Sequence, residues 1–144
     1  MTQLTIEDRF EINEKLSLAG HLFDGGELDR LDEVFTPDAV YDLTDAGVGA
    51  FEGVEAIRQA ALRLGAGNPI AHHLTNVVIT GEDDDEVTVR SKGLVLMADK
   101  TLESVTQHDI VRRHNGGWRI GRRVIKAQRA PMNGNYPAAA GHQN

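Results

Sequence analysis

The chain lacks cysteine altogether and has few aromatic residues, which make up 5% of its 144 residues. Without thiols, the sequence excludes a disulfide framework, a thiolate zinc site, an iron–sulfur cluster and a cysteine nucleophile. No stretch approaches the roughly 18 uninterrupted apolar residues of a membrane helix, and the first residues, MTQLTIEDRFEINEK, do not show the basic-then-apolar pattern of a signal peptide. These absences predict a cytoplasmic protein with no membrane partner.

Several motifs of catalysis and binding are also missing. The sequence contains no Gly-x-Ser-x-Gly elbow, and none of its histidine spacings is typical of a metal site. The segment Gly65–Asn68 follows a helical pattern and lacks the lysine of a phosphate loop, so it indicates the end of a helix. We therefore expect no metal and no cofactor.

Charge is unevenly distributed along the chain. The formal net charge is −7, and the acidic run at 82–86, which indicates a solvated turn, supplies five of these negative charges. Seven of the 15 basic residues fall within positions 112–129. The pI of about 5.3 and the single tryptophan nevertheless do not favour a nucleic-acid surface. We expect no nucleic-acid partner.

The order of periodic segments predicts the fold class. Apolar residues recur at helical intervals over 6–23, 27–35 and 54–64, whereas 40–43, 72–80, 86–97, 102–113 and 118–128 show the composition of strands. This order predicts one α+β domain over residues 1–130, in which three N-terminal helices and a cone-shaped, curved mixed sheet enclose an apolar pocket. Residues 131–144 lack periodicity and are expected to form a flexible tail.

The junction Asn115-Gly116 predicts a two-residue hairpin between the last two strands. In the ideal register Asp109 lies opposite Arg122, and a β-bulge would shift the pairing by one residue. Because neighbouring residues of a strand point to opposite faces, the sequence leaves open whether Arg122 or Arg123 faces the pocket.

One face of the predicted sheet has no helix to cover it. The apolar residues of the strands are too numerous for a surface in contact with water: Val87, Val89, Val95, Ile110 and Ile125. We expect the chain to form a homodimer, or a higher homo-oligomer, that packs sheet to sheet.

The order of elements and four blocks of sequence resemble one known family. The blocks are FDGGELDRLDEVFTPDAVYDL, FEGVEAI, AHHLTN and DIVRRHNGGWRIGRR, and over roughly residues 5–128 the chain resembles the SnoaL-like branch of the nuclear transport factor 2-like superfamily. This group includes scytalone dehydratase, a dehydrochlorinase, polyketide cyclases, ketosteroid isomerases and non-catalytic ligand binders. The resemblance therefore indicates the fold more specifically than the function.

The resemblance also implies a set of site residues. In the dehydratase and dehydrochlorinase members, an aspartate at the end of the first helix orients a histidine that acts as the base, and Asp24 and His73 match these positions. Arg123 matches a pocket arginine that could hold an oxyanion or a leaving group. Asp109 matches an acidic position common in the group, which could instead pair with the arginine that faces inward. The positions expected to contact the substrate are Tyr41, Gln107, Asp109, Phe23 and Met97.

The sequence departs from these members at three positions. Ala19 stands where several lyases carry tyrosine or lysine, Met97 falls near the second catalytic histidine of scytalone dehydratase, and Leu43 replaces its strand tyrosine. We expect a cofactor-independent lyase or isomerase that removes a proton from a small apolar cyclic, polyketide-like or steroid-like molecule. The alternative is a non-catalytic small-ligand-binding or dimerisation domain of the same fold.

Overall fold

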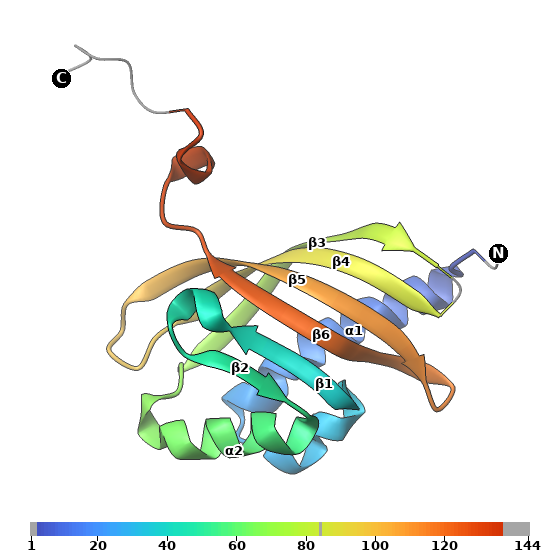
Figure 1. The fold of residues 1–144 in the computed structure, drawn as a ribbon, viewed down its shortest axis with the longest axis horizontal. Helices are drawn as coiled ribbons and strands as arrows, with labels where there is room; N and C mark the ends of the chain where they lie inside the picture. Colours follow the sequence, from blue (N-terminus) through green and yellow to red (C-terminus); the bar gives the residue numbers. More distant parts are fainter. Residues whose placement is uncertain (1–2, 84, 137–144) are drawn as a thin grey trace.

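The computed structural model describes residues 3–83 and 85–136 (Figure 1). The chain begins with helix α1 (Ile6–Asp24) and the 3₁₀ helix η1 (Leu28–Glu33), followed by strand β1 (Phe35–Leu43), η2 (Thr44–Ala46), strand β2 (Gly49–Glu52), helix α2 (Val54–Leu64) and η3 (Gly65–Gly67). Four long strands complete the domain: β3 (Ala71–Glu82), β4 (Glu86–Leu96), β5 (Leu102–His114) and β6 (Gly117–Ala127). A last 3₁₀ turn, η4 (Pro131–Gly134), follows.

The strands form one mixed sheet in the order β2-β1-β6-β5-β4-β3. Strand β1 runs parallel to β6, and every other neighbouring pair is antiparallel. Helix α1 crosses one face of the curved sheet, where it contacts β3 and β6, and α2 packs against β1 (Figure 1). The predicted α+β class with a curved mixed sheet is confirmed.

Two local predictions differ from the structure. The second helical segment is a 3₁₀ helix that ends at Glu33, and Phe35 already begins β1. Pro37, which ends the helical pattern in the sequence, lies inside β1 at the point where the pairing with β6 shifts between Phe35 and Val40. Proline is tolerated there because an irregular position needs no ladder hydrogen bond. The four-residue strand β2 was not predicted.

The hairpin between β5 and β6 is confirmed, and it contains the bulge that the sequence left open. Asn115 and Gly116 both have positive φ, of 48° and 78°, as a two-residue turn of this type requires. The register shifts between Ile110 and Val111, so Gly121 is the unpaired extra residue of β6. Beyond this bulge Asp109 lies opposite Arg123.

The core fills the space between α1 and the inner face of the sheet. Four α1 residues with helical spacing are buried there: Ile12, Leu16, Ala19 and Leu22. The largest fully buried side chains of the sheet are Trp118 and Phe35. None of the helices among residues 3–83 and 85–136 is long and apolar enough to cross a membrane.

The residues named for a sheet-to-sheet dimer are corrected. Val87 and Val89 are buried in the core, and Val95 and Ile125 line a cavity, because all four lie on the face that the helices cover. Only Ile110 lies on the outer face, together with basic residues such as Arg90 and Lys126. A two-fold packing of this face would bring like charges together. The homo-oligomer itself stays a prediction.

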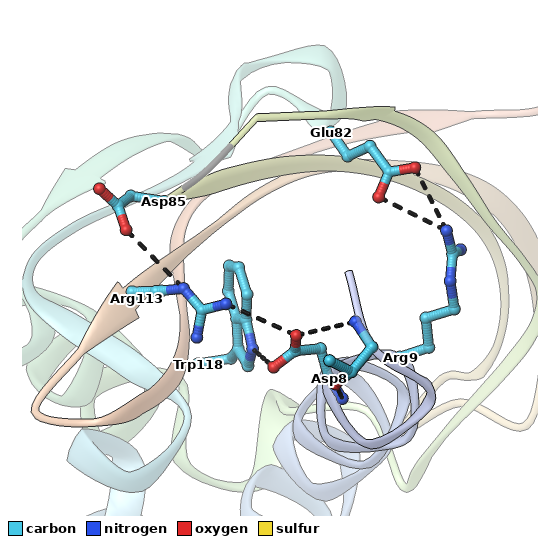
Figure 2. A network of polar contacts seen from close by, with 7 residues as sticks. Asp8, Arg9, Glu82, Asp85, Arg113 and Trp118 are labelled. Atoms are coloured by element: carbon cyan, nitrogen blue, oxygen red, sulfur yellow. Dashed lines mark hydrogen bonds and ion pairs between the residues drawn. The ribbon is translucent and has the colours of Figure 1, made fainter. Parts of the chain in front are cut away.

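Asp8 connects the start of α1 to the last strand (Figure 2). Thr5 caps the helix, and the Asp8 carboxylate accepts a hydrogen bond from the Thr5 backbone N–H (3.0 Å) and another from Trp118 Nε1 (3.0 Å). Arg113 lies over the Trp118 ring, 4.4 Å from its centroid, and 3.5 Å from the Asp8 carboxylate. The hydrogen bonds from Thr5 and Trp118 lower the pKa of Asp8 from 3.8 to about 2.

Two further ion pairs reach the β3–β4 hairpin, one from the start of α1 and one from the end of β5. Arg9 pairs with Glu82 at 3.2 Å, and Arg113 pairs with Asp85 at 3.7 Å (Figure 2). Part of the acidic run is therefore used in ion pairs, although each pair is exposed enough to contribute little by itself. Asp84 lies outside the described residues.

We expect Asp8→Asn to lower the free energy of unfolding at pH 7 by about 1–2 kcal/mol, because it removes the charge from a helix cap and from the indole hydrogen bond. The lowered pKa of Asp8 stabilises the fold above about pH 4, and this contribution is lost as the pH falls toward 2. Urea unfolding at several pH values measures both effects. A difference between the two proteins that is unchanged at pH 2 would contradict this assignment.

The segment after β6 leads away from the sheet (Figure 1). Within 131–136, the backbone hydrogen bonds of Asn133 and Asn135 are to Ala130 and Met132, and Tyr136 is 78% exposed. Residues 137–144 of the predicted tail lie outside the described residues. We expect removal of residues 131–144 to change the free energy of unfolding by less than about 1 kcal/mol. A larger loss in denaturant unfolding would show that the tail docks on the domain.

Candidate functional site

A cavity of about 790 Å³ opens between α1, α2 and the inner face of the sheet. This volume is in the range of small-molecule sites, and most of the lining is apolar. Of the predicted site residues, those that line it are Asp24, His73, Arg123, Tyr41, Gln107, Phe23 and Met97. The cavity is the candidate active site.

Asp24 and His72 form the closest polar contact in the cavity wall. Asp24 is the last residue of α1, where Gly25 ends the helix, and its Oδ1 lies 2.5 Å from Nδ1 of His72. Its other oxygen, Oδ2, accepts a hydrogen bond of 2.9 Å from the backbone N–H of the same histidine. One carboxylate thus holds both the main chain and the ring of His72, and both side chains are about one quarter exposed.

The histidine that pairs with Asp24 is therefore His72, and the predicted pairing with His73 is corrected. His72 lies opposite Val95 of β4, on the face that borders the cavity, whereas His73 lies opposite Leu94, which is 43% exposed. Successive side chains of a strand point to opposite faces, so an error of one residue exchanges inside for outside. His73 is exposed, although it is also among the residues that line the cavity.

Leu74 is the residue in the sequence that indicates which of the two histidines faces the cavity. It is an apolar residue two positions after His72, and i and i+2 residues of a strand share a face. In the structure Leu74 packs against the core and lines the cavity, as its place in this alternation requires. The alternation of apolar and polar residues thus favoured His72 over His73.

The geometry fixes the tautomer of His72. An ionised carboxylate can only accept a hydrogen bond, so a neutral His72 carries its proton on Nδ1 and has a lone pair on Nε2. Among residues 3–83 and 85–136, no hydrogen-bond partner of Nε2 is present, and the ring packs near Phe23 with centroids 6.1 Å apart. Nε2 of His72 is therefore available to accept a hydrogen bond or a proton.

Arg123 is the arginine that faces inward. Its guanidinium forms a two-point ion pair with Asp109, with distances of 2.7 and 3.0 Å, and both side chains are almost fully buried. Arg122 lies on the outer face, where it pairs with Asp42 at 3.5 Å. Asp109 is not part of the cavity lining, since Arg123 takes up both of its oxygens. These contacts favour the expectation that Asp109 pairs with the inward-facing arginine over the expectation that it contacts the substrate.

Tyr41 extends this ion pair toward the cavity. It lies beside Arg123 in the pairing of β1 with β6, and it lines the cavity next to Phe23, with ring centroids 5.9 Å apart. Burial raises the pKa of the Tyr41 hydroxyl, and the neighbouring Arg123 opposes this by lowering it. Because a guanidinium can only donate hydrogen bonds, the neighbouring Arg123 leaves the proton of the Tyr41 hydroxyl for another partner.

The described part of the chain contains no group of three or more His, Cys, Asp or Glu side chains that could hold a metal ion.

Comparison with known proteins places this arrangement in a family. The profile of the SnoaL-like domain matches residues 4–124, which is most of the chain. The chain belongs to the SnoaL-like family. This confirms the resemblance seen in the sequence. No curated protein matches the chain in sequence.

Solved structures share the SnoaL-like fold over nearly the whole domain. A protein assigned as an aromatic ring hydroxylase from Novosphingobium aromaticivorans is 29% identical, with a TM-score of 0.77 over 89% of this chain and 94% of that one. A protein from the same organism assigned as a scytalone dehydratase is 18% identical, with a TM-score of 0.73 and 86% of each chain covered. A type 2 hexachlorocyclohexane dehydrochlorinase is 20% identical, with a TM-score of 0.73 over 94% of this chain and 96% of that one.

The tautomer of His72 is a direct test of the pair. We expect nitrogen-15 NMR of the imidazole rings at neutral pH to show His72 protonated on Nδ1, and Asp24→Ala to abolish this preference because the acceptor is lost. His73 serves as the control and should have the same spectrum in both proteins. If Asp24→Ala changes His73 and not His72, the pairing is the one expected from the sequence.

Proposed function

We propose that this SnoaL-like cavity removes a proton from a small, largely apolar cyclic molecule, with His72 as the base. The observation that carries the proposal is the Asp24–His72 pair, in which the carboxylate fixes the ring and leaves Nε2 free in an apolar cavity. A neutral imidazole accepts a proton readily near pH 7, and the adjacent carboxylate stabilises the imidazolium that forms.

Tyr41 is the group proposed to stabilise the negative charge that proton removal creates. Its hydroxyl donates a hydrogen bond to an oxygen of the substrate, while the neighbouring Arg123 favours negative charge on the phenol oxygen. Asp109 neutralises Arg123, which makes the guanidinium a poorer direct ligand for an oxyanion than the sequence suggested. Arg123 then acts mainly by positioning Tyr41.

The reaction that follows proton removal is proposed from the fold neighbours. Both the scytalone dehydratase and the dehydrochlorinase are named for eliminations, of water and of hydrogen chloride, in which the C–H electron pair forms a double bond as the leaving group departs. Isomerisation or cyclisation would use the same first step. Ala19, Leu43 and Met97 supply no acid for a leaving group, which favours substrates whose leaving group departs unaided.

Proton abstraction can be measured without knowing the natural substrate. A cyclic ketone such as 2-indanone exchanges its α protons in D₂O, and the protein should accelerate this exchange above the buffer rate. His72→Gln should lower the acceleration by about 10²- to 10⁴-fold, and Tyr41→Phe by about 10²-fold. Mass spectrometry of the ketone measures the rates.

The matched control is His108→Gln, a change of the same type at an exposed histidine of β5 that does not line the cavity, which should leave the rate within about twofold of the parent. Loss of exchange in His73→Gln and not in His72→Gln would show that His73, and not His72, is the base. A parent protein that binds the ketone and does not accelerate exchange would favour the alternative of a non-catalytic small-ligand-binding domain.

A further inference from the structure

A polar layer separates the core from the cavity. The buried polar side chains Ser91, Gln107, Asp109 and Arg123 come from β4, β5 and β6 and lie side by side in the sheet. Asp109 and Arg123 satisfy each other. In the described part of the chain, two buried side-chain atoms of this layer have no hydrogen-bond partner: Oγ of Ser91 and Oε1 of Gln107.

These two unpaired atoms belong to directly opposed residues. Ser91 faces Gln107 across the β4–β5 ladder, and the two residues are only 1% and 7% exposed. A buried polar atom without a partner costs about 1–3 kcal/mol, so proteins seldom retain one in a purely structural position. Gln107 lines the cavity and Ser91 does not, which places the amide between the cavity and the hydroxyl.

Gly93 provides the space in which the Gln107 amide lies. A Cβ atom at position 93 would stand 2.8 Å from Nε2 of Gln107 and 2.8 Å from Cγ2 of Val105, closer than real Cβ atoms approach. Gly93 is not one of the glycines with positive φ, so the backbone does not require a glycine there. The absence of a side chain makes a notch on β4 that the amide fills, and the notch opens on the cavity.

We propose that the Gln107 amide, held over Gly93, is the anchor for a hydroxyl or keto oxygen of the bound molecule. An amide presents both a donor and an acceptor, and rotation of its plane turns either one to the cavity while the Ser91 hydroxyl can serve the other. The anchor therefore accepts a phenol or enol as well as a ketone. This inference deepens the proposed function, because it assigns the oxygen-bearing end of the same substrate.

The positions of Gln107 and His72 together indicate the size of the bound molecule. His72 is on β3 and Gln107 is on β5, with β4 between them. Two strand spacings amount to roughly 10 Å. Gln107 also lies four residues further along β5 than Glu103, which is in register with His72 through Val95. A ligand of two fused or linked rings can contact both side chains, and a cavity of about 790 Å³ accommodates it. The class is a fused or linked ring system with oxygen at the end opposite the acidic C–H.

Binding of two probes of equal shape tests the anchor. 5-Indanol and 5-methylindane differ in one hydroxyl group, and their dissociation constants can be measured by NMR titration. The parent protein should bind 5-indanol up to about tenfold more tightly, as one net hydrogen bond allows. Gln107→Leu should abolish this preference and leave the affinity for 5-methylindane unchanged or higher. Gly93→Ala should reduce the preference, since it displaces the amide.

Matched controls are available on the same chain. Gln59→Leu changes a glutamine of α2 that is not in the cavity lining, and Gly81→Ala places a Cβ 2.8 Å from Thr88 Oγ1, away from the cavity. Both variants should keep the preference for 5-indanol. The melting temperature of Gln107→Leu without ligand should be unchanged or higher, because an unpaired buried acceptor is removed.

Three results would overturn the proposal: no preference in the parent protein, a preference that survives in Gln107→Leu, or a lower melting temperature of Gln107→Leu with equal loss of both probes. The test is independent of the base. His72→Gln should lose ketone exchange and keep the preference for 5-indanol, so failure of the anchor and failure of the proposed chemistry are distinguishable.

Discussion

The buried ion pair between Asp109 and Arg123 forms the boundary between the solid core and the cavity. On its core side lie Val87, Val111 and Trp118, and on its other side lie Tyr41 and the cavity. Removing one partner of such a pair leaves an uncompensated charge in the interior and typically costs about 3–5 kcal/mol. The pair exists only because the bulge at Gly121 turns Arg123 inward. A single extra residue in β6 therefore decides the electrostatics of the site.

Much of the fold could be predicted from the sequence, because the signals are repeated along the chain. The helical pattern of α1, the composition of the long strands and the Asn115-Gly116 turn each rest on several residues or on a strong local preference. The four-residue strand β2 is too short for a periodic pattern, and the helical pattern over 27–35 is too short to distinguish the six-residue 3₁₀ helix η1 from an α-helix. They form because neighbouring elements supply their hydrogen bonds and burial.

The site was predicted less completely, for a physical reason that applies at two places. The sequence offered two adjacent histidines, His72 and His73, and two adjacent arginines, Arg122 and Arg123. Adjacent residues of a strand point to opposite faces, so a shift of one residue exchanges the residue inside for the one outside. Asp24 was located correctly at the end of α1, because a helix end has a sequence signal in Gly25-Gly26. The register of its partner depends on how β3 pairs with β4. The predicted dimer surface was wrong for the same reason: Val87, Val89, Val95 and Ile125 were assigned to the outer face of the sheet and lie on its inner face.

Helix α1 is attached to the sheet at both ends by carboxylates, Asp8 at its start and Asp24 at its end. These two contacts restrict movement of α1 relative to the sheet. The η2 turn is also tied down, since Asp45 accepts hydrogen bonds from the Ala127 N–H (2.8 Å) and from Arg129 (3.0 Å). Because α1 and η2 are both held by these contacts, we expect any rearrangement that admits a ligand to occur in other elements of the lining, such as η3 with Gly67 and the turn between β4 and β5 with Met97.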